Sequence, residues 1–374
     1  MTGIYIHIPF CRQRCYYCDF FSQTELFHVD RYLEAIKNQM AGYEARSIDS
    51  IYIGGGTPSL LDSSQIANLL ETINKGFKLD SNTEITVEVN PDSADKEKLY
   101  GYLYAGVNRL SIGVQSFSDR TLRTIGRLHT AEKAEQTILD AHRVGFTNIA
   151  ADIMLGLPYE GKKEVKGAIE ILAKTGVHHI SAYILKISGD TPFGKEYPEG
   201  IADDDTVADI YCYAVEQLEA KGYLQYEISN FAKRNYEGRH NKKYWNCEEY
   251  IGLGAGAFSL LESYRYHLPG DIPLYLKTFE NPSPNFMKGL VLDGPVEWDD
   301  YIIVRLRTTE GLSTKRLEQL FGFQIPARIE EEFKGFIELG LMKRENERIR
   351  LTTEGFLLSN DILSRLLLAA EYSI

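Results

Sequence analysis

The architecture of the chain follows from one segment, Tyr5-Ile-His-Ile-Pro-Phe-Cys-Arg-Gln-Arg-Cys-Tyr-Tyr-Cys18. Its first part, Ile4–Ile8, is apolar and β-prone, which predicts a strand that begins almost at residue 1. Cys11, Cys15 and Cys18 follow directly with the spacing C-x3-C-x2-C. Thiols gathered so closely in a loop after a strand indicate a metal centre at the end of that strand.

The cysteine spacing bears on the kind of metal. Three thiolates can hold three corners of a [4Fe-4S] cubane, which normally takes four cysteines. Because the loop holds no fourth cysteine, one iron would keep an open coordination position, as catalytic metal sites do. The alternative is a zinc ion with His7 or Asp19 as the fourth ligand. Zinc knuckles usually have C-x2-C spacing, so C-x3-C favours the iron–sulfur interpretation.

Short β-rich runs alternate with amphipathic helical runs through the first half of the chain. After the first strand, the predicted strands are Ile51–Ile53, Ile85–Val89, Arg109–Val114, Ile149–Leu155 and His179–Leu185. The predicted helices between them are 31–45, 64–77, 96–104, 131–144 and 163–174. This order predicts an α/β fold with a parallel sheet. Six units are too few for an eight-unit barrel, so a partial (β/α)6 barrel or a doubly wound sheet remains, with its chemistry beyond the carboxyl ends of the strands.

The pattern changes in the second half. Thr206–Ala220 predicts a helix, whereas Tyr223–Phe231 and Arg239–Trp245 are interpreted as strand or loop. From Val296, three helices, a hairpin and a last helix over Thr353–Leu367 predict a smaller winged-helix-like domain. That domain has 11 Lys and Arg against 14 Asp and Glu, which favours a structural cap or substrate lid over a DNA reader. The predicted division is 1–190 for the barrel, 191–295 for an extension that completes it, and 296–374.

Composition excludes several classes of protein. The chain of 374 residues is 44% hydrophobic and 25% charged, as in ordinary globular proteins, and its net charge is −12. Such an acidic chain is poorly suited to nucleic acid or anionic membranes. No apolar run approaches the roughly 20 residues of a membrane span, and residues 1–9 lack the features of a signal peptide. We therefore expect a cytoplasmic protein that is not an integral membrane protein.

The cysteine motif resembles that of the radical S-adenosylmethionine (SAM) enzymes, in which SAM binds the open iron of a [4Fe-4S] cluster. The resemblance extends to motifs at successive strand ends: Gly54-Gly-Gly-Thr-Pro-Ser59, Val87-Glu-Val-Asn-Pro91, Ser111-Ile-Gly-Val-Gln-Ser-Phe117 and Asp152-Ile-Met-Leu-Gly-Leu-Pro158. Together they are similar to the branch of the oxygen-independent coproporphyrinogen dehydrogenases. The resemblance implies Cys11, Cys15 and Cys18 as cluster ligands. It implies SAM contacts from Tyr5, Tyr17, Gly55, Gly56, Thr57, Glu88, Gln115, Arg127 and Asp152.

Two features depart from the dehydrogenase pattern. Its cysteine motif continues as C-x3-C-x2-C-x-C, whereas Phe20 stands at the last position here. It also has an amino-terminal extension, whereas only four residues precede Tyr5. Both departures disfavour decarboxylation of coproporphyrinogen, which is kept as the alternative function. The activity that we expect from the resemblance is a capacity to cleave SAM.

A later motif, His240-Asn-Lys-Lys-Tyr-Trp245, resembles the HNxxYW signature of the HemW-type haem chaperones, and residues 226–232 agree with the same branch. This resemblance implies haem as a ligand and a haem-acceptor protein as partner, with a membrane respiratory protein as one candidate. It indicates His240 as an axial iron ligand, with Asn241, Tyr244 and Trp245 around the porphyrin. The alternative is that His240 hydrogen-bonds locally and Trp245 packs under a loop. A monomer and a homodimer both remain open.

Overall fold

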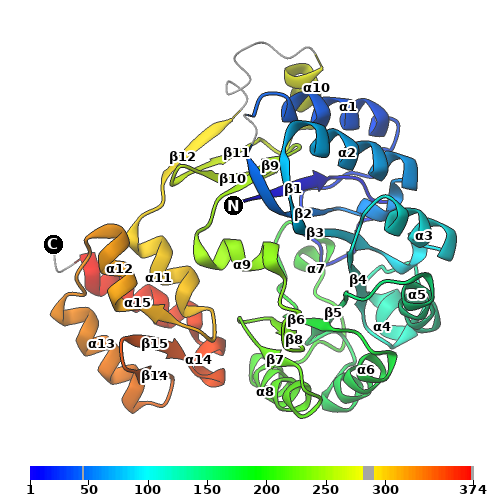
Figure 1. Ribbon diagram of the computed structural model, residues 1–374. Coiled ribbons are helices and arrows are strands. Elements are labelled where there is room, and N and C mark those ends of the chain that lie inside the picture. The colour runs from blue at the N-terminus through cyan, green and yellow to red at the C-terminus, as the bar shows by residue number, and fades with distance from the viewer. Residues whose placement is uncertain (44–45, 281–289, 372–374) are drawn as a thin grey trace.

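The computed structural model describes residues 1–43, 46–280 and 290–371 (Figure 1). Six parallel strands lie side by side in chain order: β1 (Thr2–Ile8), β2 (Ser47–Gly55), β3 (Lys78–Val89), β4 (Arg109–Gln115), β5 (Ile149–Leu155) and β6 (His179–Ile184). The predicted strands are therefore confirmed, although β2 and β3 begin earlier than their apolar runs. The curved sheet confirms the α/β prediction of a partial (β/α)6 barrel.

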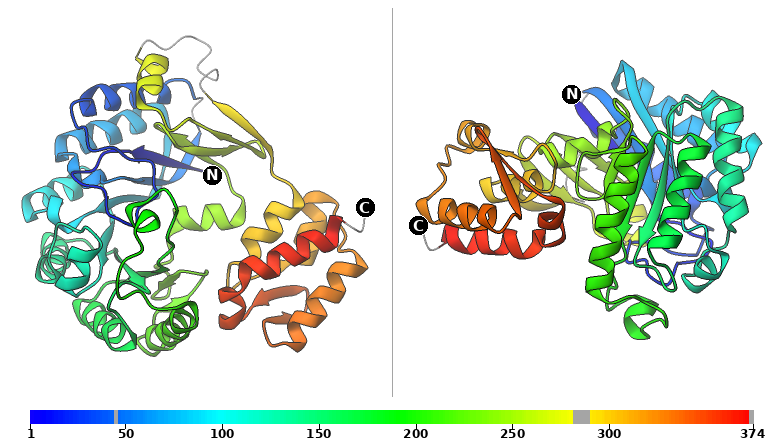
Figure 2. Two further views of the ribbon diagram at one scale, coloured as in Figure 1. Left: turned by 180° about the vertical axis from the view of Figure 1, so that it is seen from behind. Right: turned by 90° about the horizontal axis from the view of Figure 1, so that it is seen from below.

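Helices connect these strands and cover the outer face of the sheet (Figure 2). They are α1 (Val29–Met40), α2 (Ser63–Gly76), α3 (Lys96–Tyr104), α4 (Asp119–Thr124), α5 (Ala131–Val144) and α6 (Lys162–Thr175). Local chemistry sets their ends: Asp62 and Gln65 form a capping box on α2, and Gly145 ends α5 in the left-handed conformation. The helix predicted over 31–45 ends at Met40, and residue 45 lies outside the described residues.

The sheet continues beyond the six strands in both directions. On one side β9 (Tyr250–Leu253) pairs parallel with β1, and β10 (Phe258–Leu261), β11 (Tyr264–His267) and β12 (Val291–Pro295) follow in antiparallel pairing. On the other side lie β8 (Asn230–Ala232) and β7 (Leu224–Gln225). Within the described residues this makes one open sheet of 12 strands, with β12 and β7 at its edges. The sheet thus crosses the predicted boundary at residue 190, and the domain limits stay a prediction.

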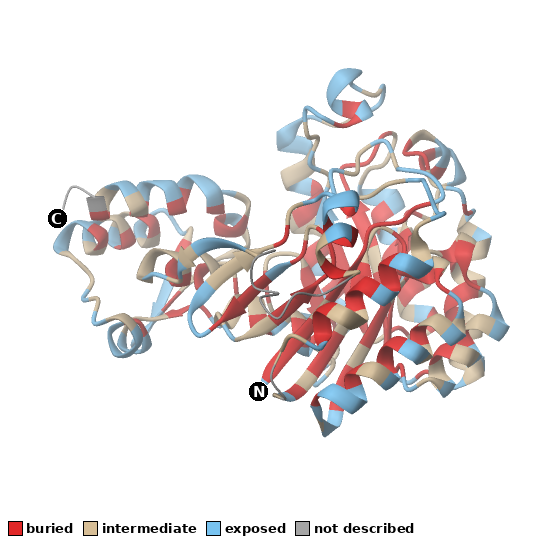
Figure 3. Ribbon diagram, turned by 90° about the horizontal axis from the view of Figure 1, so that it is seen from above, coloured by how far each residue is buried: buried red, intermediate tan, exposed pale blue. Residues whose placement is uncertain are grey.

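Strand alternation gives the sheet two different faces. Ile4, Ile6 and Ile8 of β1 are fully buried in the apolar core beneath the helices. Tyr5 and His7 alternate with them and point to the inner, concave side, because successive side chains of a strand point to opposite faces. Buried residues follow the strands (Figure 3). Charged and polar side chains, among them Glu88, Arg109 and Asp152, line the inner side, which surrounds a cavity and not a second closed core.

The helix α9 (Arg239–Asn246) shows that the strand-or-loop prediction for Arg239–Trp245 was wrong. The backbone amides of Arg239 and His240 donate to the Glu84 carboxylate of β3, at 3.0–3.2 Å. A carboxylate at a helix amino end satisfies free amides and is stabilised by the helix dipole. The polar sequence of α9 has no apolar periodicity, and its partner lies 155 residues away, so local patterns did not reveal the helix.

The carboxyl-terminal part contains α11 (Trp298–Leu306), β13 (Leu312–Ser313), α12 (Thr314–Phe321), α13 (Ala327–Glu338), β14 (Met342–Glu345), β15 (Arg348–Leu351), α14 (Thr353–Leu357) and α15 (Ser359–Glu371). Its sheet, in the order β13-β15-β14, and its helices confirm the winged-helix-like prediction. The last helix, predicted as one over Thr353–Leu367, is interrupted at Leu358. Arg305 of α11 donates to the Asn246 side chain, so this part packs against the end of α9.

The described chain has three more α-helices: α7 (Pro192–Lys195), α8 (Asp204–Ala220) and α10 (Ile272–Phe279). Two short 3-10 helices, η1 (Pro58–Leu60) and η2 (Pro91–Ser93), follow β2 and β3. The helix predicted over Thr206–Ala220 is confirmed as α8. Among the described residues, no helix has both the length and the apolar character that a membrane span needs.

Candidate radical SAM site

A cavity of about 1070 Å³ lies on the inner side of the sheet. Every residue that the sequence indicated for the cluster and SAM lines this cavity: Tyr5, Cys11, Cys15, Tyr17, Cys18, Gly55, Gly56, Thr57, Glu88, Gln115, Arg127 and Asp152. They come from the ends of β1 to β5 and the loops that follow, as expected for chemistry beyond the carboxyl ends of parallel strands. The fold thus brings together residues up to 147 positions apart.

The cysteine loop presents free thiols to this cavity. Thr57 Oγ1 donates to Cys11 Sγ at 3.4 Å, and Arg127 Nη1 lies 3.7 Å from Cys15 Sγ. Burial raises the pKa of Cys11, and it raises the pKa of Cys18 to about 11. Thiols with raised pKa values ionise when a metal ion takes the proton's place. The donors around the sulfurs therefore suit thiolates that are bound to a cationic centre.

The alternative zinc site depends on His7 or Asp19. Both ring nitrogens of His7 are already engaged, Nδ1 with Tyr5 Oη and Nε2 with the Phe21 carbonyl, each at 2.9 Å. Asp19 is exposed at the mouth of the cavity. Among the described residues, no three His, Cys, Asp or Glu side chains surround one point as a single metal ion requires. His7 is therefore not free to complete a zinc site in this arrangement.

The glycine run at the end of β2, Gly54–Gly56, lets the backbone approach the cysteine loop. A Cβ on Gly56 would lie 2.9 Å from Cys11 Sγ and 2.9 Å from the Phe10 carbonyl oxygen, closer than real Cβ atoms come. Any side chain there would push the loop away from the strand ends. Gly56 is thus required by its close packing against Cys11 and Phe10.

Glu88 is held at the centre of the site. Its Oε1 accepts from Tyr52 Oη at 2.8 Å, and its Oε2 accepts from the Gly55 amide at 3.1 Å. Burial raises its pKa to about 7, and the negative charge of Asp152 acts in the same direction. Glu88 can therefore gain or lose a proton near neutral pH.

Arg127 is the cation nearest the cysteine loop among the predicted SAM contacts. Its Nη2 donates to the Gly113 carbonyl at 2.7 Å and to Asn90 Oδ1 at 2.9 Å, which fixes the guanidinium beside Cys15. Asp152 accepts from Ser111 Oγ at 3.2 Å, and burial raises its pKa. The predicted SAM contacts thus include one fixed cation and two carboxyl groups, which match the carboxylate, ammonium and ribose hydroxyls of SAM.

His240 lies at the opposite end of the interior, where α9 closes the amino-terminal side of the sheet. It is buried, with Nδ1 3.0 Å from Ser50 Oγ and Nε2 2.9 Å from Tyr244 Oη. Burial lowers its pKa to about 3, so the ring is neutral. This is the local hydrogen bonding that the sequence left open as the alternative. Haem iron can reach His240 only by displacing Ser50 or Tyr244.

The other residues of the HNxxYW motif point in different directions. Asn241 Nδ2 donates to Tyr226 Oη at 3.2 Å inside the cavity, and Tyr244 also lines it. Trp245 is not among the lining residues; its carbonyl lies 3.5 Å from Arg305 of α11. The motif therefore joins the cavity floor to the winged-helix-like part and does not form one open face.

Sequence reasoning missed several polar residues at the floor of the cavity. These are Glu84, Arg109, His179 and Tyr226. Arg109 is fully enclosed and its Nε has no hydrogen-bond partner among the described residues. The only signal in the sequence was a charged residue within an otherwise apolar predicted strand, which reveals nothing about its partners.

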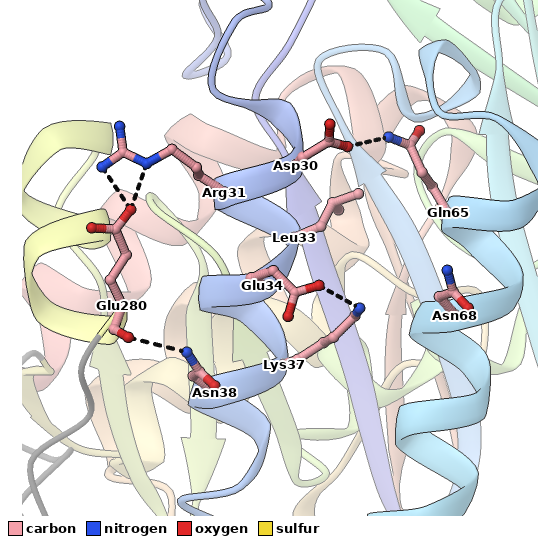
Figure 4. A pocket seen from close by; sticks show the side chains of 9 residues that line it. All are labelled: Asp30, Arg31, Leu33, Glu34, Lys37, Asn38, Gln65, Asn68 and Glu280. Carbon is pink, nitrogen blue, oxygen red and sulfur yellow. Dashed lines mark hydrogen bonds and ion pairs between the residues drawn. The ribbon is translucent and has the colours of Figure 1, made fainter.

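A second, smaller hollow of about 400 Å³ lies outside the barrel between α1, α2 and α10 (Figure 4). Its polar side chains pair with one another: Arg31 with Glu280 at 2.7 Å, and Asp30 with Gln65 at 2.8 Å. None of the predicted site residues lies there. The interior cavity is therefore the site to which the sequence motifs point.

Comparison with known proteins agrees with this geometry. Residues 5–172 match the Radical SAM superfamily model, and residues 292–358 match the HemN C-terminal domain. The fold is similar to that of coproporphyrinogen III oxidase (HemN) from Escherichia coli, with a TM-score of 0.84, 22% identity, and coverage of 98% of this chain and 89% of that chain. The fold and the cysteine site together define a radical SAM protein.

Relatives with a higher sequence identity show to which family within this class the chain belongs. The chain is 34% identical to heme chaperone HemW of Bacillus subtilis, over 98% of this chain and 99% of the relative. It is 33% identical to heme chaperone HemW of Lactococcus lactis, over 98% of this chain and 97% of the relative. The chain belongs to the HemW family.

Proposed function

We propose that this chain is a haem chaperone that carries a [4Fe-4S] cluster with SAM, binds haem and transfers it to acceptor proteins. The observation that carries the proposal is the cavity that joins the three-cysteine loop, the glycine run and Arg127 in a chain with full-length similarity to heme chaperone HemW. The name of those relatives supplies haem as the cargo.

Cys11, Cys15 and Cys18 would ligate the cluster, and its open iron would face the cavity. Arg127 would pair with the carboxylate of SAM, and the residues Gly55 to Thr57 would meet its amino group. Glu88, Gln115 and Asp152 would contact the methionyl and ribose parts, with Tyr5 and Tyr17 beside the cluster. When bound, the cluster supplies an electron and a free coordination position; the chain supplies orientation and charge.

The proposal includes a compartment and partners. The haem acceptor is a second protein, and the acidic net charge of −12 does not favour nucleic acid as a partner. We place the chaperone in the cytoplasm, where it would meet an acceptor such as a membrane respiratory protein. The choice between monomer and homodimer stays part of the proposal to be measured.

The alternative function is oxygen-independent coproporphyrinogen III oxidation, which the fold similarity to HemN favours. Against it, Phe20 stands where the dehydrogenases have a further cysteine, and its side chain lies exposed at the cavity mouth. An anaerobic assay with reductant, SAM and coproporphyrinogen III separates the two. Protoporphyrinogen as product would establish the oxidase; SAM cleavage without it would support the chaperone.

Haem binding is tested by anaerobic titration of the cluster-loaded chain while the Soret absorption is followed. The proposal predicts saturable binding near one haem per chain and release to an apo-protein acceptor on mixing. Absorption changes that do not saturate, as non-specific association would give, would contradict it.

A further inference from the structure

We propose that haem binds on the inner face of the β10–β11–β12 extension, with His267 Nε2 as the axial ligand of its iron. This inference rests on the proposed haem-chaperone function and goes beyond it by naming the site. Three features of this face support it: the hydrogen bond of His267, the apolar row around it and the continuity of the face with the SAM cavity.

His267 has the geometry of an iron-binding imidazole. Its Nδ1 lies 2.7 Å from Asp293 Oδ1. A carboxylate only accepts hydrogen bonds, so Nδ1 carries the proton and the lone pair of the neutral ring is on Nε2. Nε2 makes no hydrogen bond to the described residues, and the side chain is 30% exposed. A carboxylate on the far nitrogen orients metal-binding histidines and makes them better donors.

The neighbours of His267 on the sheet are apolar and uncovered. Phe258 of β10 and Val291 of β12 are its direct cross-strand partners, so all three side chains lie on the same face. Phe258 is 56% exposed and Val291 43% exposed, and the Phe258 and His267 ring centroids are 5.4 Å apart. A porphyrin bound through His267 would cover this row, which stabilises it by removing apolar surface from water.

The same face leads directly to the SAM cavity. Tyr250 of β9 pairs with Gly3 of β1 on one side and with Leu260 of β10 on the other, and Phe258 is two residues from Leu260. Tyr250 and Phe258 both line the cavity. Haem held by His267 would therefore lie at the mouth of the cavity that contains the cysteine loop.

Other histidines near the cavity are less suited. His7 and His240 have both ring nitrogens engaged, and His179 is buried with Nε2 2.9 Å from Tyr226 Oη. His28 provides a matched control, because it is also half-buried and lies against an exposed aromatic ring, that of Phe27, at 4.1 Å. Its ring donates to no carboxylate among the described residues.

The test is an anaerobic haem titration of the full, cluster-loaded chain and its variants His267→Ala, Asp293→Asn, His240→Ala and His28→Ala. It is read by Soret absorption and by electron paramagnetic resonance of ferric haem. We expect His267→Ala to lose the nitrogen-ligand signature and to weaken binding at least tenfold, with recovery of the signature on adding imidazole. Asp293→Asn should keep the ligand and weaken binding by roughly tenfold. His28→Ala should match the unaltered chain.

The outcomes separate the site from the function. If the unaltered chain binds haem and His267→Ala leaves both affinity and ligand signature unchanged, the site is wrong and the chaperone function stands. If the signature is lost only in His240→Ala, the iron lies at α9 and the inference is overturned. If the unaltered chain binds no haem, the proposed function itself fails.

Discussion

The cysteine loop and helix α9 each carry a short motif of metal-binding residue types, yet they present their donor atoms differently. The sulfurs of Cys11 and Cys15 lie in the cavity, 3.4 Å from Thr57 Oγ1 and 3.7 Å from Arg127 Nη1. The ring nitrogens of His240 are both within 3.0 Å of hydroxyl partners. Residue type alone suggests a metal in both places, whereas the availability of the donor atoms favours the cysteine loop over His240.

The largest effect is expected at the cysteine loop. Changing Cys15 to Ala removes one of three cluster ligands, so iron and acid-labile sulfide should fall to a small fraction of the unaltered chain's content. The measurement is anaerobic iron and sulfide analysis after reconstitution. Cys212→Ala is the matched control, since Cys212 lies on α8 and is absent from the cavity lining. Equal iron and sulfide content in both variants would show that Cys15 is not a cluster ligand.

A change at α9 should act on folding, not on the cluster. His240→Ala leaves a hole beneath β1 and two hydroxyl groups without partners, so we expect a loss of about 2–4 kcal/mol in the free energy of unfolding. Urea denaturation of the full chain measures this loss, and iron content after reconstitution should be unchanged. A variant as stable as the unaltered chain would contradict the role we assign to His240.

The protonation of Glu88 should make the affinity of the site for SAM depend on pH. Its pKa of about 7 means that the carboxylate, which attracts the cationic SAM, forms as pH rises through neutrality. SAM affinity should therefore increase by roughly three- to tenfold between pH 6 and pH 8. Stability has the opposite sign, because the folded chain retains this proton between the ordinary glutamate pKa and about 7 and loses that stabilisation as pH rises.

Equilibrium dialysis with labelled SAM measures the affinity at each pH. Glu88→Gln, which keeps the shape but cannot ionise, should bind SAM more weakly at pH 8 and show a flatter pH profile. A slope that persists in Glu88→Gln would assign the titration to another group, with Glu227 as the first to examine because burial raises its pKa to about 7 as well.

The smallest effect is expected for Tyr244→Phe. This change removes one hydroxyl partner of His240 and keeps the aromatic ring, which packs edge-on against Tyr250 at 4.7 Å. The loss of one buried hydrogen bond should cost about 1 kcal/mol of unfolding free energy, measured by urea denaturation. If Tyr244→Phe lowers the free energy of unfolding as much as His240→Ala does, the Tyr244 hydroxyl and not the His240 ring stabilises this end of the cavity.

Local patterns predicted the parts of the molecule that local chemistry determines. The six strands and most of their helices follow from apolar periodicity and from end signals such as Asp62 and Gly145. Helix α9 could not be predicted in this way, because its amino end is satisfied by Glu84 from a distant strand. The site has the same limit. The spacing of the cysteines was enough to single out their loop, whereas the hydrogen bond of His240 Nδ1 is made to Ser50, 190 residues earlier in the sequence.

The central claim is that Cys11, Cys15 and Cys18 hold an iron–sulfur cluster with one iron open to SAM. Its most direct test is electron paramagnetic resonance of the anaerobically reduced full chain with and without SAM, together with iron, sulfide and zinc analysis. We predict about four irons and four sulfides per chain and a reduced-cluster signal that changes on adding SAM. One zinc per chain, no metal, or a cluster signal indifferent to SAM would contradict the claim.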